Sequence, residues 1–205
     1  MALARNPAGH AESAGGAMSG ASSPGDVPRG QTPGRGRSGR VAAVVLAAGA
    51  ATRFGEPKQR LLLPSVLARL RAAAVEEVVV AAGAYPLEAE GVRVVPCPDW
   101  ELGPGASLRC ALGALGPDVE AAVVVLADGP GLAAEAVDRV VAAWRENETP
   151  LVAASYGGDR GHPLVVAREL WDAVPDEGLR AFDPLLVPCD DLGAPGDVDR
   201  PEDLP

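Results

Sequence analysis

The chain has a single lysine, Lys58, against seventeen arginines. Lys58 lies at the end of a glycine-containing loop, residues 48–58, which directly follows an apolar run at residues 41–47. Backbone N–H groups and basic side chains in such a loop favour phosphate binding. Lysine differs from arginine because its ammonium is a compact charge on a flexible stem. The pattern predicts that the Lys58 ammonium binds a phosphate group whose charge moves during a reaction. The alternative is that Lys58 is a chance exception to the chain's strong preference for arginine.

The loop offers a second cation, Arg53, whose guanidinium can hold a phosphate through two parallel hydrogen bonds. Its small residues allow backbone N–H groups to approach an anion, and Pro57 stiffens the chain before Lys58. The loop is not a Walker A motif, because no Ser or Thr follows Lys58, and it lacks the GxGxxG spacing of dinucleotide-binding loops. We therefore expect a different type of phosphate-binding loop.

Asp128 is a candidate metal ligand, since it directly follows a Val- and Leu-rich run at residues 121–127. A carboxylate at the end of a buried strand is costly unless it meets a cation or hydrogen-bond donors. Magnesium is the cation that binds carboxylate and phosphate oxygens together. The alternative is that Asp128 caps the following helix. Beside a phosphate loop we favour magnesium.

A second pair of acidic residues, Asp197 and Asp199, lies in the segment 197–204. Side chains at positions i and i+2 of an extended segment point to the same side. The pair could supply a second metal ligand, or the segment could simply be solvated.

Two further residues are candidates for binding substrate. His162 lies in a Gly-His-Pro sequence before an apolar run, and either a substrate contact or a structural hydrogen bond would suit it. Ser107 lies at the start of an expected helix, entered through residues 103–105, whose N-terminus could bind an anion. The alternative for this segment is a simple connector.

These residues must be positioned by apolar strands that alternate with amphipathic helices. We expect strands at 41–47, 77–82, 92–95, 121–127, 151–155 and 164–166, and helices at 64–74, 107–115 and 133–146. Continuous apolar strands separated by helices predict an α/β fold with a doubly wound, mostly parallel sheet. Ligands of such sheets bind beyond the carboxyl ends of the strands. Both the loop after residue 47 and Asp128 fall at such ends.

Composition limits the class of partner. The net charge of −10 argues against nucleic acid or an anionic membrane. Residues 1–40 carry a charge of +3, lack an apolar pattern and are expected to form a disordered basic tail before a domain at 41–205. The three cysteines, Cys97, Cys110 and Cys189, show no metal-binding spacing, so we expect reduced thiols, two of them buried, in a cytoplasmic protein.

The chain resembles the molybdenum cofactor nucleotidyltransferases, and their cytidylyltransferase branch in particular. Five blocks occur in family order: residues 46–58, 98–108, 126–130, 161–163 and 197–204. The cytidylyltransferase branch is similar in having Ala48 before Gly49, where guanylyltransferases more often have a second glycine. Trp100 and the Gly-His-Pro segment also favour that branch.

This resemblance implies a nucleotide-diphospho-sugar-transferase-like fold and an enzyme. It would transfer a nucleoside monophosphate, with CTP favoured as donor, to a phosphorylated acceptor such as molybdopterin and release pyrophosphate. Lys58 would stabilise the α-phosphate, Arg53 would bind the β- and γ-phosphates, and Asp128 and Asp199 would hold Mg²⁺, with Asp197 a weaker choice. A molybdoenzyme or its chaperone is a further expected partner. The nucleotide would lie against the backbone of Leu46, Ala47, Ala48 and Gly49.

The chain also departs from the family pattern. Ala51 stands where the family usually has Ser, Phe54 where it has Met, and Gly129 where Gln or Met is frequent. The segment after Lys58 is several residues shorter than usual. Alternatives are therefore a guanylyltransferase, a transferase for another phosphorylated acceptor, or a catalytically degenerate nucleotide-binding accessory protein.

Overall fold

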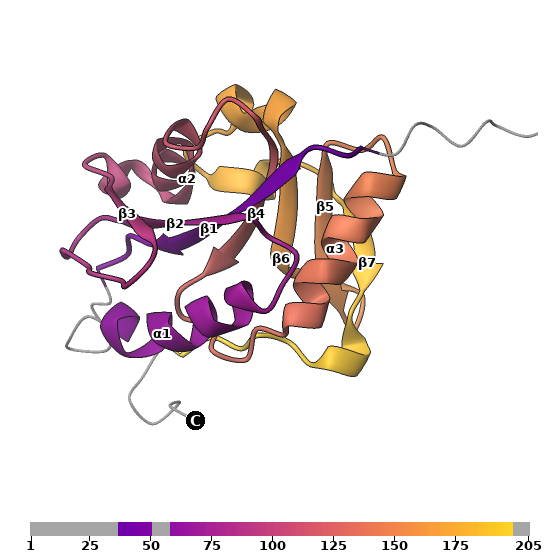
Figure 1. The fold of residues 1–205 in the computed structure, drawn as a ribbon, viewed down its shortest axis with the longest axis horizontal. Coiled ribbons are helices and arrows are strands. Elements are labelled where there is room, and N and C mark those ends of the chain that lie inside the picture. The colour runs from indigo at the N-terminus through magenta and orange to yellow at the C-terminus, as the bar shows by residue number, and fades with distance from the viewer. Residues whose placement is uncertain (1–36, 51–57, 199–205) are drawn as a thin grey trace, which may run out of the picture. The chain divides into compact units, whose positions relative to one another are not determined.

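A mixed β-sheet forms the centre of the computed structural model, which describes residues 37–50 and 58–198 (Figure 1). In the described residues the sheet has seven strands in the order β3-β2-β1-β4-β6-β5-β7. Strand β6 runs antiparallel to β4 and β5, and the other neighbours are parallel. The predicted α/β fold with a mostly parallel sheet is confirmed. The strands are β1 Arg40–Ala47, β2 Glu77–Ala82, β3 Arg93–Pro96, β4 Val119–Leu126, β5 Leu151–Tyr156, β6 Asp159–Ala167 and β7 Leu185–Pro188.

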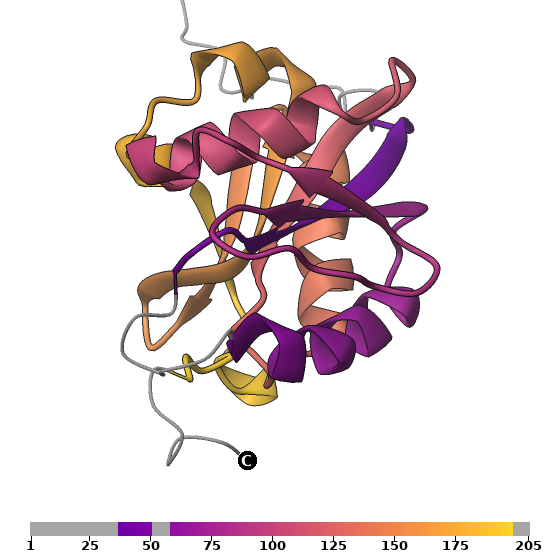
Figure 2. The same ribbon diagram turned by 90° about the vertical axis from the view of Figure 1, so that its left-hand side faces the viewer.

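Strands β1 and β4 are continuously apolar from Val41 and Ala121 onward, as expected for strands with both faces covered. Helices α1 (Lys58–Arg71) and α3 (Ala134–Glu146) pack on one face, and α2 (Pro104–Gly113) packs on the other (Figures 1 and 2). Short 3₁₀ helices extend the cover. They are η1 Trp100–Leu102, η2 Arg168–Ala173, η3 Gly178–Ala181 and η4 Asp190–Leu192.

The strand directions bring several candidate residues to one edge of the sheet. Strands β1 and β4 are parallel neighbours, so their carboxyl ends, Ala47 and Leu126, lie at the same edge. Strand β6 runs in the opposite direction, pairing Leu164 with Val124, and its first residues therefore lie at that edge too. His162 is thus placed beside the ends of β1 and β4, although it belongs to a different part of the sequence.

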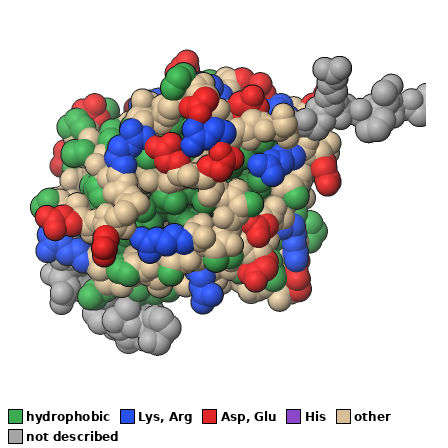
Figure 3. Space-filling view, in the orientation of Figure 1, with side chains coloured by type: hydrophobic (Ala, Val, Ile, Leu, Met, Phe, Trp, Pro, Cys, Tyr) green, Lys and Arg blue, Asp and Glu red, His purple; other side chains and the backbone are tan. Residues whose placement is uncertain are grey.

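Charged side chains of both signs are interspersed over the face shown in Figure 3, with apolar side chains exposed between them. None of the helices in the described part of the chain is long and apolar enough to span a membrane.

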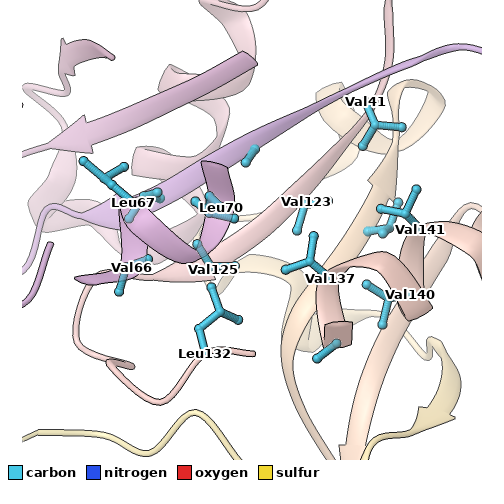
Figure 4. Packing of buried hydrophobic residues seen from close by; sticks show 14 of the residues in the cluster. Val41, Val66, Leu67, Leu70, Val123, Val125, Leu132, Val137, Val140 and Val141 are labelled. Carbon is cyan, nitrogen blue, oxygen red and sulfur yellow. The ribbon is translucent and has the colours of Figure 1, made fainter. Parts of the chain in front are cut away.

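Helix α1 begins earlier than the sequence suggested. We expected it at residues 64–74 from the helical spacing of Val66, Leu67 and Leu70, but it runs from Lys58 to Arg71 with Pro64 inside. Proline has no N–H and breaks one intrahelical bond, a cost that packing can offset. The buried side chains of α1 include Val66, Leu67 and Leu70, which lie against the sheet (Figure 4). Lys58 is therefore held at the start of a packed helix rather than in a loop.

Two other expectations differ from the structure. Strand β6 starts at Asp159, well before the predicted residue 164, and strand β7 was not predicted at all. Strand β7 has only four residues, and Leu185 and Leu186 are both exposed, so it shows little alternation of apolar and polar side chains. Short edge strands of this kind carry a weak sequence signal.

The cysteines correct the expectation of three reduced thiols. Cys97, directly after β3, and Cys110, in α2, form a disulfide with their Cα atoms 5.8 Å apart. Cys189 is a free, buried thiol. Cys97 and Cys189 are both buried, as the sequence suggested for two of the three. The pairing could not be derived from the sequence, because nothing in it shows that the residue after β3 faces α2.

Candidate active site

The loop after β1 is fixed by hydrogen bonds to its carbonyl groups. Ala127 N–H donates to the Leu46 carbonyl at 3.0 Å and Ala84 N–H donates to the Ala48 carbonyl at 3.0 Å. These bonds tie the loop to the ends of β4 and β2. With these carbonyls held by the fold, the peptide groups of residues 46–48 have a fixed orientation at the carboxyl edge of the sheet.

Two side chains that the sequence analysis did not single out also hold this loop. Gln59 is buried and donates from Nε2 to the Gly49 carbonyl at 2.7 Å. The Tyr85 hydroxyl donates to the Ala50 carbonyl at 3.0 Å. Gln59 directly follows Lys58, so its position was a usable signal, whereas Tyr85 comes from another part of the chain. Residues 51–57, with the predicted phosphate ligand Arg53, lie outside the described residues.

Lys58 is the first residue of α1 and only 7% of it is exposed. Its Nζ lies 2.9 Å from Asp128 Oδ2 and 3.7 Å from Asp197 Oδ1. It also donates to the Val198 carbonyl at 2.7 Å. The two residues that the sequence analysis singled out first, Lys58 and Asp128, are thus in direct contact.

Asp128 lies just beyond β4, at the sheet edge where β1 also ends. Helix α3 has Ala133 as its N-cap residue, so the alternative that Asp128 caps this helix is wrong. The backbone next to Asp128 is paired with a distant segment: Val198 N–H donates to the Asp128 carbonyl at 3.1 Å, and Gly131 N–H donates to the Pro195 carbonyl at 2.9 Å. This pairing brings the end of the described chain to the candidate site.

The oxygen atoms around Lys58 Nζ suit a divalent cation. Carboxylate and carbonyl oxygens are the ligands that Mg²⁺ and similar ions prefer, and here they already converge on one positive charge. Within residues 37–50 and 58–198 no three acidic, His or Cys side chains cluster as a metal site would require. A site in this part of the chain would therefore combine Asp128 and Asp197 with the Val198 carbonyl. The predicted ligand Asp199 lies outside the described residues.

His162 precedes a cis peptide bond to Pro163 near the start of β6. Burial lowers the pKa of His162 to about 4, the positive charge of Arg160 adds to this, and Asp128 acts in the opposite direction. The imidazole is therefore neutral at pH 7. The Tyr156 hydroxyl donates to the His162 carbonyl at 3.0 Å, which fixes the backbone of this segment.

Two cavities meet at His162. One, of about 320 Å³, lies towards Tyr156, Gly129 and Pro195. The other, of about 250 Å³, lies towards Leu46 and η3. Arg160 also lines both cavities, and its guanidinium donates to the carbonyls of Leu179 and Phe182 at 2.8 Å each.

Ser107 lies inside the first turns of α2 and is buried, with only 3% exposed. It lines neither of the two cavities at His162, although Leu108 and Pro104 of the same helix line the second. The structure therefore does not bring Ser107 together with His162 in a common cavity.

Comparisons with known proteins bear on the family and the fold of the chain. A family model described as the MobA-like NTP transferase domain matches residues 43–182. The crystal structure of the Rv0371c homologue from Mycobacterium sp. strain JC1 is 28% identical, with a TM-score of 0.67, over 80% of this chain and 92% of that one. A search of curated proteins gave no match.

Two further solved structures have the same fold. Rv0371c from Mycobacterium tuberculosis H37Rv, in complex with manganese, is 24% identical with a TM-score of 0.60, over 73% of this chain and 88% of that one. A nucleotidyl transferase from Methanothermobacter thermautotroptrophicus is 16% identical with a TM-score of 0.61, over 80% of this chain and 94% of that one. The family match contains Lys58, Asp128 and His162, whereas Asp197 lies beyond it.

Proposed function

The chain belongs to the family of MobA-like NTP transferase domains, and on this basis we propose a magnesium-dependent transfer of a nucleoside monophosphate to a phosphorylated acceptor. CTP is the favoured donor, molybdopterin the favoured acceptor, and pyrophosphate the leaving group. A molybdoenzyme or its chaperone would then take the product. The observation that carries the proposal is the contact between the buried Lys58 ammonium and Asp128 at the carboxyl edge of the sheet.

The reaction needs alignment and charge neutralisation more than covalent help. An oxygen of the acceptor phosphate attacks the α-phosphorus of the nucleotide, and the bond from the α-phosphorus to the bridging oxygen breaks. In our proposal Lys58 donates hydrogen bonds to the α-phosphate as negative charge develops. The loop at Leu46, Ala47, Ala48 and Gly49 orients the nucleotide, and Arg53 holds the leaving phosphates.

Asp128 and an acidic residue of the 197–199 segment would hold the divalent cation. When bound, such an ion neutralises charge on the triphosphate. The support for this assignment is the set of oxygen atoms from Asp128, Asp197 and Val198 that already surrounds a positive charge. The relative Rv0371c has been solved with manganese, which is consistent with a divalent ion in this family.

The acceptor would bind next to His162. The neutral imidazole can donate or accept a hydrogen bond but cannot neutralise a phosphate, so we propose that His162 contacts an uncharged part of the substrate. The cavity towards Tyr156 is the favoured acceptor site, because Asp128 follows β4 directly and Gly129 lines this cavity. Ser107 remains a proposed substrate contact through the N-terminal part of α2.

The proposal is tested by pyrophosphate release from the full-length protein with each of the four NTPs, Mg²⁺ and molybdopterin. We expect release to be fastest with CTP and to be lost in Asp128→Asn. Release with GTP but not CTP would support the guanylyltransferase alternative. CTP that stabilises the protein against heat without any release would favour a nucleotide-binding accessory protein and contradict the proposal.

A further inference from the structure

The Lys58 ammonium lies where oxygen atoms from two distant segments converge. Asp128 Oδ2 and the Val198 carbonyl lie 2.9 Å and 2.7 Å from Nζ, and Asp197 Oδ1 lies 3.7 Å away. The lysine side chain is 9% exposed, compared with 26% for Asp128 and 60% for Asp197. The Lys58 ammonium thus lies on the buried side of the cluster, and the two carboxylates lie on the solvent side.

These oxygens are of the type that binds a hard divalent cation. We propose that Lys58 occupies the cation position in the nucleotide-free protein, and that the ammonium must leave Asp128 before a divalent ion can use the same oxygens. The inference rests on the proposed function, since it gives Lys58 two successive partners: the carboxylates first and a nucleotide phosphate afterwards.

Charge makes the two occupants mutually exclusive. Two like charges a few ångströms apart repel each other at the surface of a protein, and a divalent ion doubles the repulsion felt by a single positive charge. A triphosphate offers the ammonium new negative partners, so nucleotide binding would draw Lys58 away and favour the ion. A lysine suits this exchange because its flexible stem carries a compact charge, whereas an arginine fork would hold a carboxylate bidentately.

The backbone segments that carry these oxygen atoms are joined independently of Lys58. Val198 N–H bonds to the Asp128 carbonyl, and the Val198 side chain is buried against Leu62 of α1. Gly131 N–H bonds to the Pro195 carbonyl, and a Cβ atom at Gly131 would lie only 2.8 Å from that oxygen. The two segments therefore stay together when the ammonium withdraws, and the Asp128 and Asp197 side chains remain on adjoining backbone within reach of one ion.

Mn²⁺ affinity measured without nucleotide or acceptor tests the exchange. Titration followed by electron paramagnetic resonance should show that Lys58→Met binds Mn²⁺ about tenfold or more tightly than the wild type. The matched control is Arg60→Met, which removes a positive charge from the same helix. Arg60 is exposed and its guanidinium donates to the Pro86 carbonyl, so its loss should change the affinity by less than about twofold. Adding Asp128→Asn to Lys58→Met should abolish the gain.

Equal Mn²⁺ affinity of the wild type and Lys58→Met would overturn the inference, as would an equal gain in Arg60→Met. Failure of every form to bind Mn²⁺ would overturn it too. These outcomes are separate from failure of the proposed function, which is decided only by pyrophosphate release.

A second measurement uses the wild-type protein and so does not depend on how the variant folds. Lys58 is the chain's only lysine, so an amine-acylating reagent reports on this one side chain and on the terminal amino group. Peptide mass spectrometry should show slow acylation of Lys58 in the metal-free protein and several-fold faster acylation with saturating Mn²⁺. The terminal amino group is the internal control. Acylation of Lys58 that stays the same or slows with Mn²⁺ would contradict the exchange.

Discussion

Lysine is among the residues that proteins rarely bury, yet Lys58 is almost completely buried. Its ammonium is paired with Asp128 and bonded to the Val198 carbonyl, but a buried ion pair is no more stabilising than apolar residues of the same volume. Stability therefore gives no reason to place this residue here. A function that needs a mobile positive charge does give such a reason. The sequence supports this, because the chain has arginine and not lysine at all its other Lys or Arg positions.

We predict that Lys58→Ala lowers kcat/KM by an amount equivalent to roughly 2–4 kcal/mol of transition-state stabilisation, because one preorganised charge donor is lost. Lys58→Arg should restore little activity, since the guanidinium has a different shape. Steady-state pyrophosphate release measures both, with Arg60→Met as the control that keeps wild-type activity. Wild-type turnover of Lys58→Ala would remove Lys58 from the mechanism.

The partly buried His162 should make stability depend on pH. Burial lowers its pKa from an ordinary value near 6.5 to about 4, so between these pH values the unfolded chain binds more protons than the folded one. The free energy of unfolding should fall as the pH drops from about 6.5 to 4, by up to about 3 kcal/mol, and His162 should contribute no slope above pH 7.

Urea unfolding of the wild type and His162→Gln at several pH values isolates this contribution. The difference between the two proteins should follow the expected slope, while the carboxylates contribute equally to both. An imidazole that titrates near 6.5 in the folded protein, seen by NMR, would contradict the burial argument.

At the level of secondary structure, the packing around the loop after β1 depends on a glycine at the end of β2. A Cβ atom at Gly83 would lie 2.6 Å from the Ala48 carbonyl oxygen and 2.7 Å from the Cβ atoms of Ala48 and Trp100. We predict that Gly83→Ala lowers the free energy of unfolding by about 1–3 kcal/mol and weakens nucleotide binding, because Ala48 must move.

Gly113→Ala is the matched control for this substitution. Gly113 ends helix α2, and a Cβ atom there would meet nothing within 4 Å. Alanine should be neutral or stabilise by up to about 1 kcal/mol. Thermal unfolding and CTP titration of both variants provide the comparison, and equal behaviour of the two would show that the loop tolerates the displacement.

The strands of the sheet were more predictable than the helix ends. Residues 41–47 of β1 and 121–126 of β4 are continuous runs of Val, Ala and Leu. In an α/β chain such runs are typical of buried strands. The start of α1 was missed because the helical apolar spacing is recognisable only from Val66 onward, while the early turn is held by the buried Lys58 and Gln59, whose partners lie elsewhere in the chain. Such tertiary contacts override a local signal.

At the scale of the molecule, the sequence predicted the edge of the sheet at which the site lies. It singled out Lys58 as a phosphate contact and Asp128 as a metal ligand from their positions after two apolar runs, but it did not predict their direct contact. It did not indicate the Val198 carbonyl, because every residue type carries a backbone oxygen. It also did not indicate the pairing of residues 128–131 with 195–198. The acidic composition argues against nucleic acid as a general partner, and charges of both signs share the face shown in Figure 3.

The central claim is that a triphosphate binds beyond the carboxyl ends of β1 and β4, between Lys58 and Asp128. A crystal structure of the full-length protein with CTP and Mg²⁺ tests it most directly. We predict that Lys58 Nζ lies within hydrogen-bonding distance of a phosphate oxygen and that Asp128 binds the ion. A nucleotide bound in another part of the protein, with Lys58 still paired to Asp128, would contradict the account.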